Sequence, residues 1–208
     1  NDYVLTPNGC WHDHGIAADG EVSIWQDGLD IPLMNCMETN FYAVYDQPAQ
    51  TAAFPVDDLP LSYGGAALRP EGVPAWEKPY SPVMVYRWEA TRDALWNLAK
   101  VSDGTPFDDH MVRYSNPLTG GWALQTMGAH MQMLKPGFRG KAHRHTGNVV
   151  YNVASGRGYS IIGGERFEWG THDIFCVPAW TWHEHVNLDT SEEAFLFSFN
   201  DFPVMEAL

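Results

Sequence analysis

Short β-type segments separated by tight turns dominate the chain from Gly121 onward, and they limit the folds open to it. Apolar and aromatic side chains are frequent in residues 123–134, 149–154, 158–162, 166–169, 174–177 and 195–199, and in some of these segments, such as residues 166–169, they alternate with polar ones. Turn-forming pairs such as Ser155-Gly156 and Gly163-Gly164 stand between them. Alternation with period two is typical of strands that bury one face, and closely spaced short strands favour a jelly roll. This part of the chain is therefore predicted to form an all-β jelly-roll barrel.

The rest of the chain divides into two regions. Residues 1–45 hold four further alternating segments that predict strands, at residues 3–5, 22–25, 31–34 and 40–45. Residues 46–120 contain many prolines, which deny donors to a β-ladder and suit an extended connection. Helical periodicity is convincing only over residues 88–100, with Thr91 as a candidate cap. We expect one short helix in this connection.

A short internal repeat indicates two barrels. The segment from Asp2 to His14 lies 171 residues before the segment from Asp173 to His185, and both place Pro, Trp-His and a second His at equivalent positions. The second copy is preceded by His143-Arg144-His145, but nothing comparable precedes the first. We therefore expect residues 1–45 to be the remnant of an N-terminal barrel and residues 121–208 to be a complete C-terminal one.

Composition excludes several classes of function. The net charge is −14, with only 12 Lys plus Arg, which argues against a nucleic-acid or anionic-lipid surface. No run of 18 apolar residues and no basic-plus-apolar leader occurs, so neither a membrane span nor a signal peptide is expected, and Asn1 indicates that the chain does not begin at its natural start. The three cysteines are widely spaced and form no CxxC pair, which predicts reduced thiols and a cytoplasmic protein.

Histidine spacing predicts a metal site. His143 and His145 would lie on one face of a strand, so both imidazoles would face the barrel interior. His183 is the natural third ligand, and three nitrogen ligands leave positions open for substrate and oxygen; His185 could then act beside the metal. The alternative is that these are ordinary hydrogen-bonded side chains, but an unpaired buried imidazole would cost about 1–3 kcal/mol.

These motifs resemble those of the cupins. Pro7 to His12 is similar to the second cupin signature, and Pro178 to His183 with Asn187 fits it except that Trp180 replaces glycine. Val149 stands where the first signature has glutamate.

A three-histidine site without glutamate resembles the gentisate 1,2-dioxygenase group of bicupins, which includes the salicylate and 1-hydroxy-2-naphthoate enzymes. The chain looks like their C-terminal two thirds. The blocks that carry this likeness include Trp11 to Gly15, Trp25 to Pro32, Asn116 to Gly121, His143 to Thr146 and Val177 to His185.

The resemblance implies Fe(II) as cofactor and an aromatic hydroxy acid and O2 as substrates, with the ring cleaved between its carboxyl- and hydroxyl-bearing carbons. It implies that His12 is a metal ligand of the N-terminal barrel, His14 a catalytic hydrogen-bonding or acid/base residue, and Asp27 a carboxylate of the same pocket. For Asp27 a simple turn residue is the alternative. We also expect a homo-oligomer.

One departure keeps alternatives open. The family has a substrate-binding arginine six residues after the second His of its N-terminal HxH, whereas Tyr151 holds that place here. The chain could therefore be a noncatalytic cupin half, or a binding or isomerase-type cupin that uses Zn or Mn. Three histidines outside the motifs, His110, His130 and His172, are expected to be structural or exposed, and Asp108-Asp109-His110 is expected to be a solvated turn.

Overall fold

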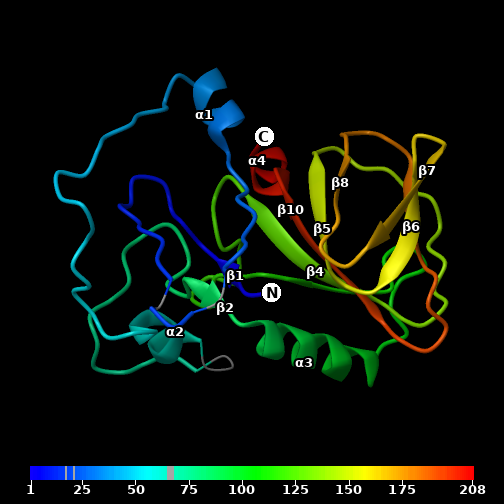
Figure 1. Ribbon diagram of the computed structural model, residues 1–208, viewed down its shortest axis with the longest axis horizontal. Helices are drawn as coiled ribbons and strands as arrows, with labels where there is room; N and C mark the ends of the chain where they lie inside the picture. The colour runs from blue at the N-terminus through cyan, green and yellow to red at the C-terminus, as the bar shows by residue number, and fades with distance from the viewer. Residues whose placement is uncertain (17, 21, 65–67) are drawn as a thin grey trace.

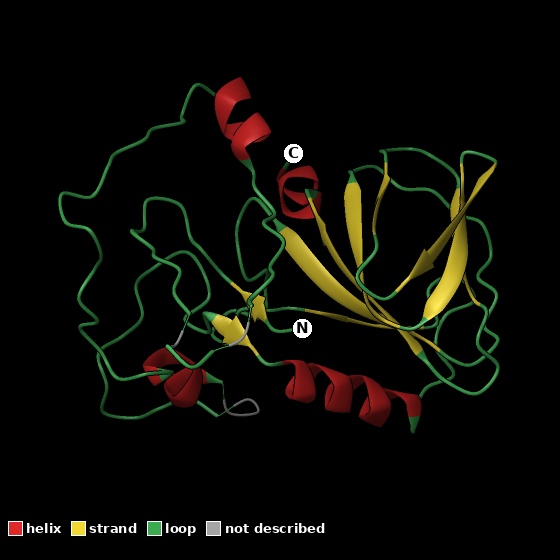
Figure 2. Cartoon of the chain, in the orientation of Figure 1, coloured by secondary structure: helices red, strands yellow, loops and turns green. Residues whose placement is uncertain are grey.

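The computed structural model describes residues 1–16, 18–20, 22–64 and 68–208, and most of its regular secondary structure is β-sheet (Figures 1 and 2). The ten strands in the described residues are β1 (Tyr3–Val4), β2 (Val85–Tyr86), β3 (His110–Arg113), β4 (Gly128–Leu134), β5 (Val149–Ser155), β6 (Arg157–Ile162), β7 (Glu165–Gly170), β8 (Ile174–Val177), β9 (His183–Asn187) and β10 (Ala194–Asn200). The four helices there are α1 (Ile31–Cys36), α2 (Asp58–Tyr63), α3 (Trp88–Ala99) and α4 (Phe202–Ala207).

Two antiparallel sheets form the C-terminal part. The larger has the strand order β3-β4-β10-β5-β8 and the smaller β7-β6-β9. The non-sequential order, with β10 between β4 and β5, is typical of jelly-roll topology. The predicted all-β cupin fold is confirmed, although the strands lie in two separate sheets and no closed ladder joins them among the described residues.

Alternation along β4 serves two different cores. Met131 and Met133 pack with Leu95 of α3 on the outer face of the larger sheet. Leu134 points to the other face, where it joins Trp169 of the smaller sheet. The interior between the sheets is therefore lined by the even-numbered residues of β4, and the metal site described below opens into it.

Helix α3 confirms the predicted helix but not its cap. The residue before the helix is Arg87, in an extended conformation, and Thr91 lies inside the first turn with its hydroxyl donating to the Arg87 carbonyl. The helix start is capped from a distance, because the Trp88 N–H donates to a carboxylate oxygen of Asp2 at 2.9 Å. Burial raises the pKa of Asp2, but the Trp88 N–H and the Arg87 guanidinium outweigh it, and the pKa is lowered overall.

The N-terminal region is less regular than predicted. Only β1 is found among its expected strands, paired with β2 through Tyr3 opposite Tyr86. Residues 22–25 and 40–45 are irregular, and residues 31–34 belong to helix α1, which has Pro32 in its first turn. Alternation gives a strand only where a neighbouring strand accepts its hydrogen bonds, and the described residues offer none to these segments.

The proline-rich region carries more structure than a simple connection. It contains α2, β2 and α3, and its last strand, β3, pairs with β4 at the edge of the larger sheet. Sequence reasoning also missed β9, whose residues include two of the motif histidines.

Candidate metal centre

The candidate ligand residues are held together by backbone pairing between two segments 40 residues apart. His143 and His183 form an isolated antiparallel bridge, in which each N–H donates to the other's carbonyl over 3.0 and 2.9 Å. The Trp180 N–H donates to the His145 carbonyl at 2.8 Å. His143 and His145 thus lie in a loop docked on the start of β9, rather than in a regular strand as predicted.

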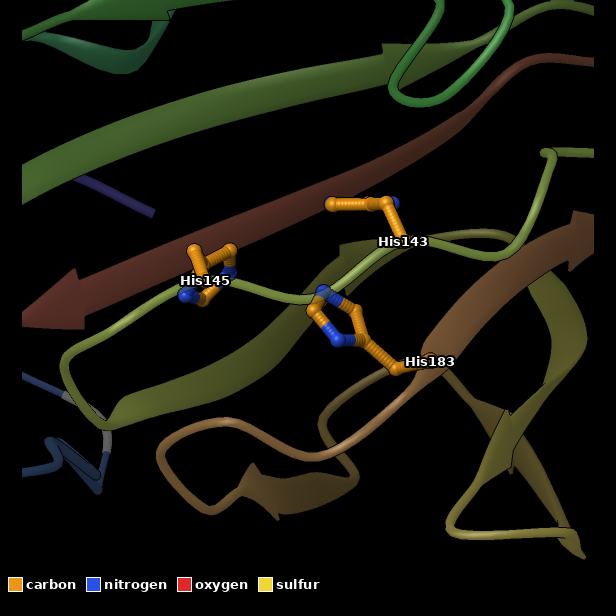
Figure 3. Close-up of side chains that lie close together, drawn as sticks. All are labelled: His143, His145 and His183. Carbon is orange, nitrogen blue, oxygen red and sulfur yellow. The ribbon is translucent and has the colours of Figure 1, made fainter.

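Three imidazoles meet at this bridge. His143, His145 and His183 each offer a ring nitrogen, and these three atoms lie within 4.8 Å of one another (Figure 3). Each ring turns Nδ1 toward a nearby backbone carbonyl, that of Lys141, Thr146 or Thr181, at 3.4, 3.2 and 2.9 Å. Such contacts fix the ring tautomer and leave Nε2 with a free lone pair. The arrangement presents three Nε2 atoms to one ion.

Burial supports this reading of the histidines. The His183 side chain is 1% exposed, and its Nε2 has no hydrogen-bond partner among the described residues. Burial lowers the pKa of His183 to about 4, and burial also lowers that of His145. Both rings are therefore neutral at pH 7, the form that coordinates metal. A buried nitrogen without a partner is costly in a metal-free protein, and a bound ion would satisfy it.

The three imidazole ligands narrow the choice of metal ion. Imidazole nitrogen suits divalent Fe, Zn, Cu and Ni, and three neutral ligands on one side of an ion leave coordination positions for small molecules. The residues present therefore fit the metal that the sequence motifs predict, without selecting iron over its neighbours.

His185 lies beside the cluster but outside it. It is fully buried, and its Nδ1 lies 2.7 Å from the Ser160 hydroxyl oxygen, which in turn accepts the Trp169 indole N–H at 3.0 Å. Burial lowers the pKa of His185 well below its usual value. Its Nε2 has no partner among the described residues. His185 is thus a neutral imidazole fixed by Ser160, two residues beyond His183 on β9.

The turn before β9 reproduces the turn of the first motif copy. The Cys10 N–H donates to the Pro7 carbonyl, and the Thr181 N–H donates to the Pro178 carbonyl, both at 3.2 Å. The third residue of each turn has positive φ: 74° at Gly9 and 61° at Trp180. A bulky residue in this conformation is strained, so Trp180 needs compensation from its surroundings.

Arg144 supplies that compensation. Its guanidinium carbon lies 4.4 Å from the Trp180 ring centre and 4.6 Å from that of Trp182. Because Arg144 separates the two histidines of the HxH motif, this cation–π contact ties the ligand loop to the ligand-bearing turn.

The chain matches known proteins in sequence. The cupin domain family model matches residues 130–199. The chain is 38% identical over 208 residues to 5-aminosalicylate 1,2-dioxygenase of Comamonas sp, covering all of this chain and 54% of that protein. It is 34% identical to gentisate 1,2 dioxygenase 1 of Aquipseudomonas alcaligenes, over 96% of this chain and 56% of that protein. The chain is a relative of the gentisate 1,2-dioxygenases.

A solved structure agrees with this relationship. Salicylate 1,2-dioxygenase from Pseudoaminobacter salicylatoxidans, crystallised with gentisate, superposes with a TM-score of 0.74 at 28% identity. The match covers 86% of this chain and 49% of that protein. The chain thus spans about half the length of the dioxygenases it matches, and it shares their cupin fold.

The structure places the N-terminal candidates apart from this cluster. His12, His14 and Asp27 are exposed, and the only metal-type group found among the described residues is the one at His143, His145 and His183. His14 stacks on Trp25 with ring centres 4.8 Å apart, and the His12 ring lies 5.4 Å from that of His14. The role of these residues in a dioxygenase N-terminal barrel remains a prediction.

Tyr151, which stands where the resemblance to the N-terminal barrel of the family implies arginine, is buried beside His185. Its ring stacks on Phe175 at 4.9 Å and meets the His185 ring edge-on at 4.7 Å. Burial raises its pKa. The surface that Tyr151 and Phe175 present to His185 is therefore aromatic and uncharged.

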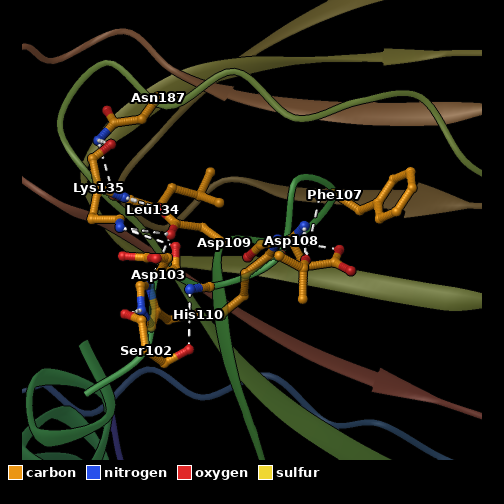
Figure 4. Close-up of polar contacts among 12 residues, drawn as sticks. Ser102, Asp103, Phe107, Asp108, Asp109, His110, Leu134, Lys135 and Asn187 are labelled. Atoms are coloured by element: carbon orange, nitrogen blue, oxygen red, sulfur yellow. Dashed lines mark hydrogen bonds and ion pairs between the residues drawn. The ribbon is translucent and has the colours of Figure 1, made fainter. Parts of the chain in front are cut away.

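The expectation of a solvated turn at Asp108-Asp109-His110 is wrong for its last two residues. Asp109 and His110 are 2% and 1% exposed, and their Oδ1 and Nδ1 atoms contact at 2.8 Å (Figure 4). Asp109 also accepts the Lys135 N–H at 2.6 Å, and His110 Nε2 lies 2.9 Å from the Ser102 carbonyl. The pair closes the loop before β3. His110 is therefore structural, as expected.

Two further interior residues had no signal in the motif spacing. Gln132 is buried on β4, and Asp108 stands near His143 with its Oδ1 3.8 Å from His143 Nε2. Burial raises the pKa of Asp108, and the neighbouring imidazoles of His143 and His145 act in the opposite direction. Only the folded sheet brings β4 and the turn before β3 to the histidines.

No helix among the described residues has the length and apolar character needed to cross a membrane. The three cysteines are unpaired and exposed.

Proposed function

We propose that this chain is the metal-binding part of an Fe(II)-dependent dioxygenase that cleaves the ring of an aromatic hydroxy acid between its carboxyl- and hydroxyl-bearing carbons. The convergence of the three imidazoles of His143, His145 and His183 carries the proposal. The named activities of its relatives, which include gentisate and 5-aminosalicylate 1,2-dioxygenases, supply the substrate class.

Each part of the site has a defined task in this proposal. His143, His145 and His183 would hold the ion, and bound Fe(II) would supply the open positions and the electrons that O2 chemistry needs. His185 would present its Nε2 to the reacting groups as a hydrogen-bonding or acid/base residue, held by Ser160. Tyr151 and Phe175 would keep water from the floor of the site.

Part of the proposal concerns residues outside the three-histidine group. His12 is proposed as a ligand, and His14 and Asp27 as substrate-side residues, of a second pocket that resembles the N-terminal barrel of the dioxygenases. A homo-oligomeric state and a cytoplasmic location are also proposed, and the free cysteines are in line with the location.

A noncatalytic metal-binding half, or one that holds Zn or Mn, is the second candidate. Tyr151 is the observation that favours it, because a buried, uncharged phenol can donate one hydrogen bond to a substrate carboxylate but cannot form the bidentate ion pair expected of an arginine. In that case the ion would serve stability or support a partner barrel.

Oxygen consumption distinguishes the two. The protein is loaded anaerobically with Fe(II) and given gentisate, salicylate, 5-aminosalicylate or 1-hydroxy-2-naphthoate, beside His183→Ala and His12→Ala. Uptake that His183→Ala abolishes would support catalysis at the three-histidine site. Uptake lost only with His12→Ala would assign the chemistry to the second pocket, and no uptake from iron-loaded protein would favour the noncatalytic half.

A further inference from the structure

Two buried side chains near the histidine cluster carry a polar atom without a partner, and a partly exposed carboxylate lies beside Gln132 and His143. His183 Nε2 and Gln132 Oε1 have no hydrogen-bond partner among the described residues, although both residues are 1% exposed. The carboxylate belongs to Asp108, whose side chain is 22% exposed and whose Oδ1 lies 3.4 Å from Gln132 Nε2 and 3.8 Å from His143 Nε2. Buried polar atoms are nearly always paired, so a group of them in one place indicates a ligand that they share.

Asp108 is fixed beside the ligand loop by its own turn. Its N–H donates to the Thr105 hydroxyl oxygen at 2.9 Å, and the turn closes through reciprocal backbone hydrogen bonds between Thr105 and Asp109. The Lys141 N–H donates to the Pro106 carbonyl at 2.8 Å, and this hydrogen bond joins the turn to the irregular segment that precedes His143. The position of Asp108 relative to His143 is therefore set by backbone contacts.

Gln132 orients the Asp108 residue from the other side. Its Nε2 donates to the Asp108 carbonyl at 3.0 Å and approaches Oδ1 at 3.4 Å. The amide nitrogen of Gln132 hydrogen-bonds only to Asp108, while its buried oxygen has no partner, which destabilises the fold. This arrangement is explained if the function of Gln132 is to fix the position of Asp108. Gln132 and the turn together hold the Asp108 carboxylate beside His143.

The distance between Asp108 and His143 points to a shared third group. Their Oδ1 and Nε2 atoms are 3.8 Å apart, which is too long for a hydrogen bond between them. Two atoms that approach one ion at roughly 2 Å each lie at most about 4 Å apart, so both atoms can face the same ion. Asp108 lies outside the group of three mutually close ligand atoms, so it acts as a charge beside the ion rather than as a fourth ligand.

We propose that Asp108 supplies the negative charge of this metal site, facing the ion held by His143, His145 and His183. Three neutral imidazoles leave a divalent ion with its full charge, and Asp108 is the one carboxylate that forms an ion-pair contact with any of the three among the described residues. Its charge offsets part of the ion's charge in a poorly solvated interior, where such an interaction is strong. Asp108 is then a metal-affinity residue. The inference rests on the metal binding in the proposed function but not on ring cleavage.

Titration of the full chain with Co(II) tests this inference. Asp108→Asn keeps the size of the side chain and the backbone contacts with Thr105, and it removes only the charge. We expect the Co(II) affinity to fall about 10- to 100-fold, the range found when partners of metal ligands are removed, and the visible absorption of bound Co(II) to change. The thermal unfolding temperature of the metal-free protein should stay close to that of the wild type.

Matched variants separate charge from structure. Asp108→Glu keeps the charge and should recover part of the affinity, and Asp108→Ser serves as a second neutral variant if Asp108→Asn folds poorly. Asp103→Asn removes an exposed carboxylate from the same loop and should bind Co(II) as the wild type does. Wild-type affinity and spectrum in both neutral variants would overturn the role of Asp108 and leave the proposed function standing. Failure of the wild type to bind Co(II) or Fe(II) would overturn both.

Discussion

The backbones of His143 and His183 hydrogen-bond to each other in both directions, so the two segments that carry the metal ligands are already in register before any ion binds. An ion held by both segments adds a further link between the loop and β9. Metal binding should therefore stabilise the fold as well as the site.

The first prediction concerns this stabilisation. At a free metal concentration 100 times the dissociation constant, a divalent ion should raise the free energy of unfolding by about 2.7 kcal/mol. Anaerobic thermal unfolding with and without Fe(II) measures the effect. His145→Ala should fold but lose the shift. An equal shift in His145→Ala would mean that the ion binds elsewhere.

The second prediction concerns the contact of Arg144 with Trp180 and Trp182. Arg144→Ala should cost about 1 kcal/mol of stability and weaken metal binding, because the HxH loop loses its link to the turn before β9. Arg166→Ala is the matched control, since it removes a similar contact over Tyr159 on the smaller sheet. Denaturant unfolding and metal titration of both variants check this; unchanged metal affinity in Arg144→Ala would refute the link.

The third prediction concerns the left-handed backbone of Trp180. Trp180→Gly relieves strain of about 1–3 kcal/mol, whereas Trp180→Ala keeps the strain and loses the same contact with Arg144. The glycine variant should therefore be about 1 kcal/mol more stable than the alanine variant in urea unfolding. Alanine equal to or better than glycine would show that the position is not strained.

The fourth prediction concerns pH. Burial lowers the pKa of His130 to about 4, and the Asn200 amide donates to its Nδ1 at 3.2 Å. Between pH 6.5 and 4 the unfolded chain takes up a proton there that the folded chain does not. The contribution of His130 to stability is complete above about pH 6.5 and is lost as the pH falls toward 4.

His130→Gln should thus flatten the fall in stability of the metal-free protein across that range, and the exposed His172→Gln should not. Urea unfolding at several pH values makes the comparison. Parallel curves for the wild type and His130→Gln would contradict the assignment.

The sequence predicted the parts of the fold that depend on local pattern. Apolar segments bounded by turn residues located β5, β6, β7, β8 and β10 almost to the residue, and HxH spacing with the Pro178 turn identified all three members of the histidine group. Both signals are local: side-chain period along a strand and turn chemistry.

What could not be predicted depends on pairing between distant segments. β3 is a strand because β4 lies beside it, and residues 22–25 and 40–45 alternate without a neighbour to pair with. Asp108 reaches His143 only because the turn before β3 docks on the loop that contains Lys141. The conformation of Trp180 follows from the repeat with Gly9, but its contact with Arg144 required the structure.

The most direct test of the account is the coordination of iron in the anaerobically loaded protein, measured by X-ray absorption or by a crystal structure. We predict an ion bound by three imidazole nitrogens at roughly 2 Å, from His143, His145 and His183 through Nε2. A folded, iron-loaded protein that holds no iron at these three histidines would contradict this prediction.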